Sequence, residues 1–280
     1  MNVLLSLPQL GMGTWGMGGK FEREERNADE SVELLRYGFE LGFRLVDVAE
    51  RYGEGLTEEI VGRALSGRKR SEFFIISKVW KDRLRYDDVL RAAEGSLQRL
   101  GAGYIDLYLV HWPNPEVPLR ETMRALQTLR ERAVIRHIGM SNFTVPLLEE
   151  ARALLKSAPL AANEAEYNLA ARDAEKDVIP YCKAHGIQFI AYRPLAKGAL
   201  LSEKNAVLDS LAEKYRKMPA QVALNWITRQ GITAIPKAGS REHLEENWGA
   251  VGWELSEEDA RLFGEGPLKA DEAGSPPARG

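Results

Sequence analysis

Helix-period segments alternate with short apolar runs along almost the whole chain, and no other feature limits the possible folds as strongly. The helix-period segments lie at 28–42, 56–65, 86–101, 119–133, 145–156, 174–186 and 219–231, and strand-type runs follow them at 43–48, 73–79, 105–111, 135–141, 160–167, 187–194 and 232–237. A weaker run near 250–253 is expected to supply an eighth strand. Apolar strands separated by helices predict an α/β fold with a parallel sheet buried on both faces.

A closed barrel and an open, doubly wound sheet both satisfy this pattern, and two features favour the barrel. The 280 residues accommodate eight strand–helix units, since single-domain barrels occupy about 250 residues. In addition, no GxGxxG turn follows the first strand-type run, as a doubly wound dinucleotide-binding domain would require. The glycine-rich stretch 11–19 precedes that run, and we interpret it as an N-terminal hairpin over the barrel floor.

These observations predict one domain. We expect a single-domain (β/α)8 TIM barrel over residues 1–266. The remaining residues, 267–280, are rich in Pro, Gly, Ala and charge, and we expect them to form a flexible tail.

Composition excludes several classes of partner. The net charge is −3 with both signs interleaved, which argues against a nucleic-acid partner. The single cysteine, Cys182, has no internal disulfide partner and fits a reducing compartment. The apolar N-terminal patch lacks a basic region and is broken by Pro8, and no segment has the length of a membrane span. We therefore expect a cytoplasmic protein without a membrane partner, as a monomer or weak oligomer.

Four chemically capable residues stand at or just beyond the ends of apolar runs: Asp47, Tyr52, Lys78 and His111. In a parallel barrel the carboxyl ends of the strands converge on one mouth, so these residues are expected to be neighbours. An ammonium with a paired carboxylate can lower the pKa of a phenol from about 10. Taken singly, each residue has an ordinary structural explanation, such as a turn, a solvated lysine or ring packing. Together they predict a proton-delivering site.

The sequence motifs around these residues resemble those of a known family. The stretches LVDVAERYGEG, IISKVW, LVHWP, IGMSNF, AYRPLAKG and IPKAGSREHLEEN occur in the order and at roughly the spacing typical of aldo-keto reductases, between residues 11 and 262. The resemblance implies that Tyr52 is the general acid for carbonyl reduction, that Lys78 stabilises its phenolate and that Asp47 holds the lysine. It also implies that His111 orients the carbonyl oxygen of a small-molecule substrate. The four histidines are scattered, and no metal site is expected.

The same resemblance implies a nicotinamide cofactor, NADPH, with NADH as a second usable form. Ser141 and Asn142 correspond to the pair that contacts the carboxamide, and Tyr192 to the tyrosine that stacks on the nicotinamide ring. The full set of residues expected at the cofactor is Thr14, Trp15, Asp47, Ser141, Asn142, Glu164, Tyr192, Arg193, Pro194, Leu195, Gly198, Lys237, Ala238, Ser240, His243, Glu246 and Asn247.

Three positions depart from the family pattern. Glu164 stands where glutamine is usual, so the carboxamide would lose a donor and face a charge. Arg193 stands where serine is common, and it either reaches the pyrophosphate or blocks part of the groove. His243 stands where arginine is frequent, and a neutral imidazole binds a 2′-phosphate less well than a guanidinium. Lys237 retains a charge for that phosphate, with Arg241 close by, so NADPH is expected to be preferred.

Aromatic residues next to the catalytic candidates predict an apolar substrate pocket. Trp15, Trp80 and Trp112, with His111, are expected to line it. Two other functions remain open at this point. Lys78 is also the type of residue that forms a Schiff base in aldolase-type barrels. Potassium-channel β subunits resemble aldo-keto reductases yet act as regulatory, cofactor-binding partners.

Overall fold

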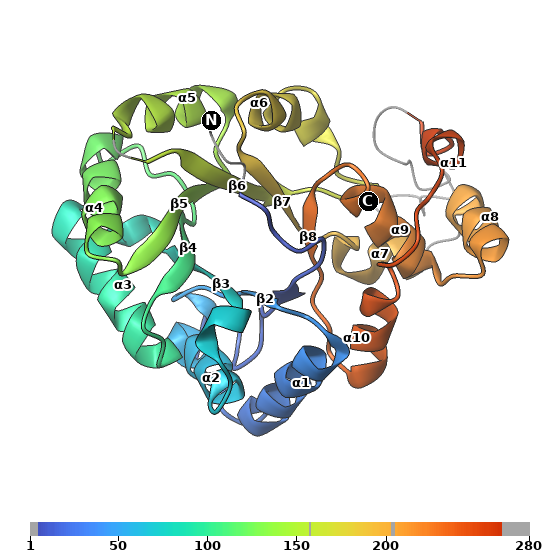
Figure 1. Cartoon of the computed structure of the whole chain (residues 1–280), viewed down its shortest axis with the longest axis horizontal. Coiled ribbons are helices and arrows are strands. Elements are labelled where there is room, and N and C mark those ends of the chain that lie inside the picture. The colour runs from blue at the N-terminus through green and yellow to red at the C-terminus, as the bar shows by residue number, and fades with distance from the viewer. Residues whose placement is uncertain (1–4, 157, 203–204, 265–280) are drawn as a thin grey trace, which may run out of the picture.

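Eight parallel strands form a closed barrel in the computed structural model, which describes residues 5–156, 158–202 and 205–264 (Figure 1). The strands are paired in chain order and comprise β1 (Met12–Gly13), β2 (Leu45–Asp47), β3 (Phe74–Val79), β4 (Ile105–Val110), β5 (Ile135–Ser141), β6 (Leu160–Glu166), β7 (Gln188–Tyr192) and β8 (Thr233–Ile235). Parallel bridges from Leu10 to Ala234 and from Gly13 to Lys237 close the ring between β1 and β8. The predicted (β/α)8 barrel is confirmed.

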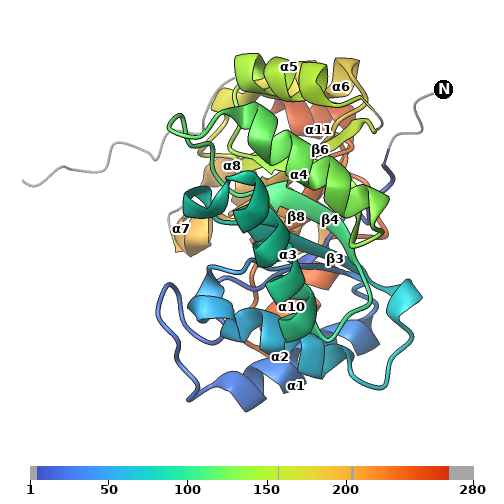
Figure 2. The same cartoon turned by 90° about the vertical axis from the view of Figure 1, so that its left-hand side faces the viewer.

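The helices surround the sheet. They are α1 (Ala28–Leu41), α2 (Leu56–Leu65), α3 (Tyr86–Leu100), α4 (Leu119–Glu131), α5 (Val145–Leu154), α6 (Val178–Ala184), α7 (Ala199–Ser202), α8 (Ala206–Tyr215), α9 (Pro219–Thr228), α10 (Arg241–Trp248) and α11 (Glu257–Arg261). From the side, α1 to α5 follow one another around the outside of the barrel (Figure 2). Left-handed glycines end two of them, Gly42 after α1 and Gly101 after α3, because an αL residue there satisfies the last carbonyls.

The eighth strand does not come from the segment that we expected. Residues 250–253 form a bend, because the Asn225 side chain donates hydrogen bonds to the carbonyls of Ala250 and Trp253, at 3.0 and 2.9 Å. The missing strand is β1, inside the glycine-rich stretch that we had interpreted as a hairpin. A Cβ at Gly13 would lie 2.7 Å from the Ile235 carbonyl oxygen, so glycine is required where β1 and β8 approach each other.

The barrel floor is covered by the residues before β1. Leu5 and Leu7 pack against the interior cluster that contains Leu45 and Leu107, and the Thr233 hydroxyl donates to the Pro8 carbonyl at 3.1 Å. This segment crosses the barrel opening in Figure 1. Because it closes the end where the strands begin, the site is confined to the opposite end.

Two further expectations concern the periphery. The predicted flexible tail, 267–280, lies outside the described residues. Among the described residues, none of the helices has the length and apolar character needed to cross a membrane.

Candidate active site

The ends of three neighbouring strands bring the four catalytic candidates together. Asp47 ends β2, Lys78 lies near the end of β3, His111 follows β4, and Tyr52 begins the short 3-10 helix η1 (Tyr52–Gly55). The Lys78 ammonium donates to the Asp47 carboxylate, to the Val48 carbonyl at 3.2 Å and to the Tyr52 hydroxyl at 3.4 Å. The carboxylate, ammonium and phenol therefore form one chain of contacts.

Lys78 is fully buried and stays positively charged. Burial by itself lowers the pKa of the Lys78 ammonium, but the nearby carboxylates of Asp47 and Glu164 outweigh it and the net pKa is raised. Burial raises the pKa of Asp47, against the attraction of Lys78. A buried ion pair of this kind contributes little net stability, which is consistent with a functional purpose.

The pKa of Tyr52 differs from our expectation. The Lys78 ammonium does act to lower it, but burial of the phenol raises it more, and the charges of Asp47 and Glu164 add to the increase. The net pKa of Tyr52 therefore lies above 10 instead of below it. The prediction took account of the ammonium and its paired carboxylate but not of the desolvation of the phenolate. At neutral pH the hydroxyl keeps its proton, which a proton donor requires.

His111 lies beside the phenol with its ring edge-on. The ring centroids of His111 and Tyr52 are 5.7 Å apart with the planes at 72°, and the Trp80 ring lies 5.0 Å away on another side. Burial, and then the charge of Lys78, hold the pKa of His111 well below its usual value. The imidazole is neutral at pH 7, so one ring nitrogen can donate a hydrogen bond and the other can accept one.

A second buried carboxylate, that of Glu164, completes the polar cluster. It lies on β6, is 2% exposed, and its Oε1 atom is 3.5 Å from the Lys78 ammonium. Its Oε2 atom is buried without a hydrogen-bond partner among the described residues. Burial, and then the Asp47 charge, raise the pKa of Glu164 to about 8.

Asn142, Ser141 and Tyr192 form a second set of contacts next to this cluster. The Asn142 amide donates to the His111 carbonyl and to the Ser141 hydroxyl, both at 3.0 Å. Its carbonyl oxygen accepts the Tyr192 hydroxyl at 2.9 Å, and its φ of 62° lies in the left-handed region that asparagine tolerates. The ring of Tyr192 is thus fixed by its own hydroxyl.

Thr14 and Trp15, which follow β1, also reach the site. The Thr14 hydroxyl donates to the Asp47 carbonyl at 2.7 Å, which ties the end of β1 to β2, the strand that carries the Asp47 carboxylate. The Trp15 ring lies 4.8 Å from that of Tyr52 with the planes at 79°. The glycine-rich stretch therefore contributes both a barrel strand and site residues.

The aromatic wall contains a residue that the sequence analysis missed. The Phe21 ring lies 4.9 Å from Trp15 and 6.4 Å from Trp80, and the residue is 46% exposed. Its only sequence signal was its isolation as an aromatic residue in the charged run 20–26. Trp15 and Trp80 lie in contact with the catalytic candidates, whereas the expected Trp112 is 42% exposed.

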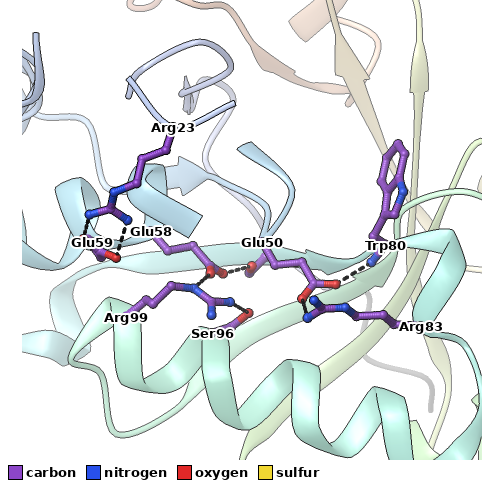
Figure 3. A network of polar contacts seen from close by, with 9 residues as sticks. Arg23, Glu50, Glu58, Glu59, Trp80, Arg83, Ser96 and Arg99 are labelled. Carbon is purple, nitrogen blue, oxygen red and sulfur yellow. Dashed lines mark hydrogen bonds and ion pairs between the residues drawn. The ribbon is translucent and has the colours of Figure 1, made fainter. Parts of the chain in front are cut away.

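A buried carboxylate two residues before Tyr52 in the chain, Glu50, was also missed. It accepts the backbone N–H of Trp80 at 2.8 Å and the Arg83 guanidinium at 3.1 Å (Figure 3). In the same network Glu58 accepts the Arg99 guanidinium at 2.7 Å. Glu50 therefore joins the loop that carries Tyr52 to the loop that carries Trp80.

Residues expected at the adenosine end border a cavity of about 400 Å³. It is lined by Gly16, Met17, Lys237, Ala238, Gly239, Ser240 and Arg241 from the segments after β1 and β8, and by Asn27, Glu30, Ser31, Glu33 and Leu34 from the start of α1. Ser240 caps α10 by accepting the His243 N–H at 3.3 Å. On this helix His243 is exposed, Glu246 is half-buried and Asn247 is buried.

The segment after β7 forms a tight loop that includes the expected residues Pro194, Leu195 and Gly198. Arg193, Ala196, Lys197 and Gly198 all have positive φ, and the Leu195 carbonyl accepts the Gly198 N–H at 2.8 Å. The Arg193 guanidinium pairs with Glu166 at 3.1 Å.

Within the described residues, no group of three or more potential ligands is placed to hold a metal ion.

Comparison with known proteins identifies the family. The model of the aldo/keto reductase family matches residues 9–265. The chain belongs to the aldo/keto reductase family. Relatives include the methylglyoxal reductase YeaE of Escherichia coli K12, 37% identical over 92% of this chain and 90% of its own length. The glyoxal reductase of Bacillus subtilis 168 is 39% identical over 91% of this chain and 87% of its own length.

Solved structures of aldo-keto reductases share the architecture. The thermostable aldo-keto reductase Tm1743, in complex with the inhibitor epalrestat, superposes with a TM-score of 0.87 at 40% identity, over 92% of this chain and 94% of that chain. An aldo/keto reductase from Klebsiella pneumoniae, in complex with NADP and acetate, superposes with a TM-score of 0.82 at 33% identity, over 95% and 94% of the two chains.

Proposed function

We propose that this aldo-keto reductase reduces aldehydes and ketones to alcohols with NADPH, and that Tyr52 donates the proton. One observation carries the assignment: the buried Lys78 ammonium contacts both the Asp47 carboxylate and the Tyr52 hydroxyl. Such an arrangement places a protonated phenol and a fixed cation at the mouth of the barrel. Those are the two elements that stabilise a developing alkoxide.

The described residues fit a nicotinamide cofactor at both of its ends. His111 Nδ1 and Glu164 Oε2 are buried without hydrogen-bond partners among the described residues, so the nicotinamide end offers unused polar groups. At the other end, Lys237 and Arg241 both line the cavity beside α1, which suits a phosphorylated adenosine. The solved Klebsiella pneumoniae relative is a complex with NADP.

The chain's own residues would divide the reaction between them. When bound, the reduced cofactor supplies a hydride to the carbonyl carbon. The neutral His111 imidazole would donate a hydrogen bond to the carbonyl oxygen and so orient it. Tyr52 would give its hydroxyl proton to the oxygen as negative charge develops there. Lys78, held by Asp47, would stabilise the phenolate that remains.

The names of the relatives support small dicarbonyl compounds as substrates. Two of them are a methylglyoxal reductase and a glyoxal reductase. The aromatic wall of Trp15, Phe21 and Trp80 borders Tyr52 and His111, so an aldehyde could place its carbonyl on His111 and its carbon chain on these rings.

Charge at the adenosine end supports a preference for NADPH over NADH. Lys237 and Arg241 line this cavity, but Ala238 has no hydroxyl to offer and His243 is exposed. Burial, and then the nearby charge of Lys20, lower the pKa of the Lys237 ammonium. We infer a moderate preference, with NADH as a second usable cofactor.

We also infer a cytoplasmic monomer or weak oligomer, since the free Cys182 is buried and charges of both signs are interspersed along the chain.

The test is a Tyr52→Phe variant, followed by NADPH absorbance with a panel of aldehydes, ketones and keto acids. Removing the hydroxyl preserves the ring contacts with Trp15 and His111, so NADPH binding should persist. Reduction should fall by about 10²–10⁴-fold, the usual contribution of a general acid. Undiminished turnover in Tyr52→Phe would show that another group supplies the proton.

Two other functions are less well supported. A Schiff-base lysine requires a neutral amine, whereas the carboxylates around Lys78 raise its pKa. Borohydride trapping with substrate would detect such an adduct. A regulatory subunit comparable to potassium-channel β subunits would bind NADPH tightly and reduce every carbonyl slowly, and the substrate panel distinguishes this outcome.

A further inference from the structure

Glu164 introduces a titratable charge into the cluster around Lys78. Its carboxylate lies 3.5 Å from the Lys78 ammonium, and its second oxygen is buried without a partner among the described residues. On β6, Glu164 pairs with Ser141 of the neighbouring strand β5. The carboxylate of Glu164 therefore lies next to the Lys78 ammonium, and its backbone pairs with the strand end that carries the proposed carboxamide-binding pair.

The charge of this cluster depends on one proton. Lys78 and Asp47 form an ion pair, so an uncharged Glu164 leaves the trio neutral and an ionised Glu164 gives it a charge of −1. The ionisable and polar groups that face Glu164 come from β2, η1, β3 and β7, and they are Asp47, Tyr52, Lys78 and Tyr192.

Most of these neighbours do not change their protonation state near neutral pH. The pKa values of Tyr52, Tyr192 and Lys78 are raised above their ordinary values, so neither phenol loses its proton and the lysine stays charged. The pKa of His111, which lies beyond Lys78, is lowered well below its ordinary value. Burial, and then Asp47, raise the pKa of Glu164 to about 8, so the charge of this carboxyl changes above neutral pH.

We propose that Glu164 determines how strongly the site distinguishes the two redox forms of the cofactor, with its ionised carboxylate favouring the oxidised form. This inference rests on the proposed function. The oxidised nicotinamide ring carries a positive charge and the reduced ring is neutral, whereas the phosphates are the same in both. A carboxylate close to the ring attracts only the oxidised form, and a protonated carboxyl attracts neither.

The expected effect follows from linkage. An opposite charge within about 4–6 Å lowers the pKa of a carboxyl by 1–3 units, and each unit corresponds to a tenfold change in relative affinity. As pH rises from 6.5 to 9, the ratio of the Kd for NADPH to the Kd for NADP⁺ should therefore increase on the order of tenfold or more. Titration of the 2′-phosphate affects both forms and cancels in the ratio.

The experiment measures Kd for NADP⁺ and NADPH separately at pH 6.5 and 9, by quenching of tryptophan fluorescence and by calorimetry, in the full-length wild-type protein. Trp15 and Trp80 border the site and should report binding. Glu164→Gln removes the titration but keeps the shape of the side chain, and its ratio should be the same at both pH values. Glu166→Gln is the matched control on the same strand, since that half-exposed carboxylate pairs with Arg193. This control should retain the wild-type dependence.

Each outcome is decisive. A ratio in the wild type that does not change with pH overturns the inference even if Glu164→Gln does not fold. An unchanged pH dependence in a folded Glu164→Gln protein overturns it as well, because the charge would then come from another group. If neither nucleotide binds at any pH, the proposed function fails, and that result is distinct from binding of both nucleotides with a constant ratio.

Discussion

The buried carboxyl of Glu164 should make the stability of this protein decrease as the pH rises. In the folded protein its pKa is raised from 4.5 to about 8, so between these values the folded state holds a proton that the unfolded state has lost. Stability is then lost as pH increases through this window and levels off above it. Between pH 6 and pH 9, stability is lost over the two pH units that separate pH 6 from the folded-state pKa of about 8. At about 1.4 kcal/mol per unit, the free energy of unfolding should fall by about 2–3 kcal/mol.

Glu164→Gln isolates this contribution. The variant has no carboxyl at this position, so the difference in stability between it and the wild type should change by about 2–3 kcal/mol between the two pH values, in favour of the variant at pH 9. For a domain of this size that corresponds to about 5–10 °C in melting temperature. Urea and thermal unfolding of the cofactor-free proteins at pH 6 and 9 measure it, with Glu166→Gln as the exposed control. Parallel pH profiles for the wild type and Glu164→Gln would refute the reasoning.

The remaining predictions concern the two ends of the proposed binding site. Phe21→Ala should raise KM for an aldehyde with an apolar chain by about 5–30-fold, which corresponds to roughly 1–2 kcal/mol of lost apolar contact, and should leave kcat nearly unchanged. Initial-rate kinetics with short and long aldehydes test this. An equal rise in KM for both chain lengths would argue against contact between Phe21 and the carbon chain. Lys237→Ala should weaken NADPH at least about tenfold and NADH much less, since only NADPH has a 2′-phosphate to pair with the ammonium; a proportionate loss for both nucleotides in binding assays would place Lys237 elsewhere.

The barrel could be predicted from the sequence because its strands and helices follow one another in a pattern that is visible locally. Seven strands and the helices between them carry clear apolar periods, and in a barrel strand neighbours follow chain order. The remaining strand, β1, is two residues long and contains Gly13, which has no side chain to contribute to an apolar pattern. Its pairing with β8 depends on a close approach between chain segments more than two hundred residues apart.

The candidate site was predicted unevenly for a similar reason. Asp47, Tyr52, Lys78 and His111 have recognisable neighbours in the sequence, so they could be placed at or just beyond strand ends. The raised pKa of Tyr52 could not be predicted, because it depends on how completely the fold removes the phenol from water. Phe21 was missed because its role depends on two rings that lie elsewhere in the chain.

The carboxylate of Glu50 has a practical consequence for changing what this protein accepts. Glu50 lies in the loop that carries Tyr52 and accepts the backbone N–H of Trp80. The proposed general acid and the indole proposed to border the substrate therefore depend on the same carboxylate. Exchanging the loop after β3 for that of another reductase would break this contact unless the new loop offers an N–H at the same place. Redesign for bulkier compounds should therefore replace both loops as a unit.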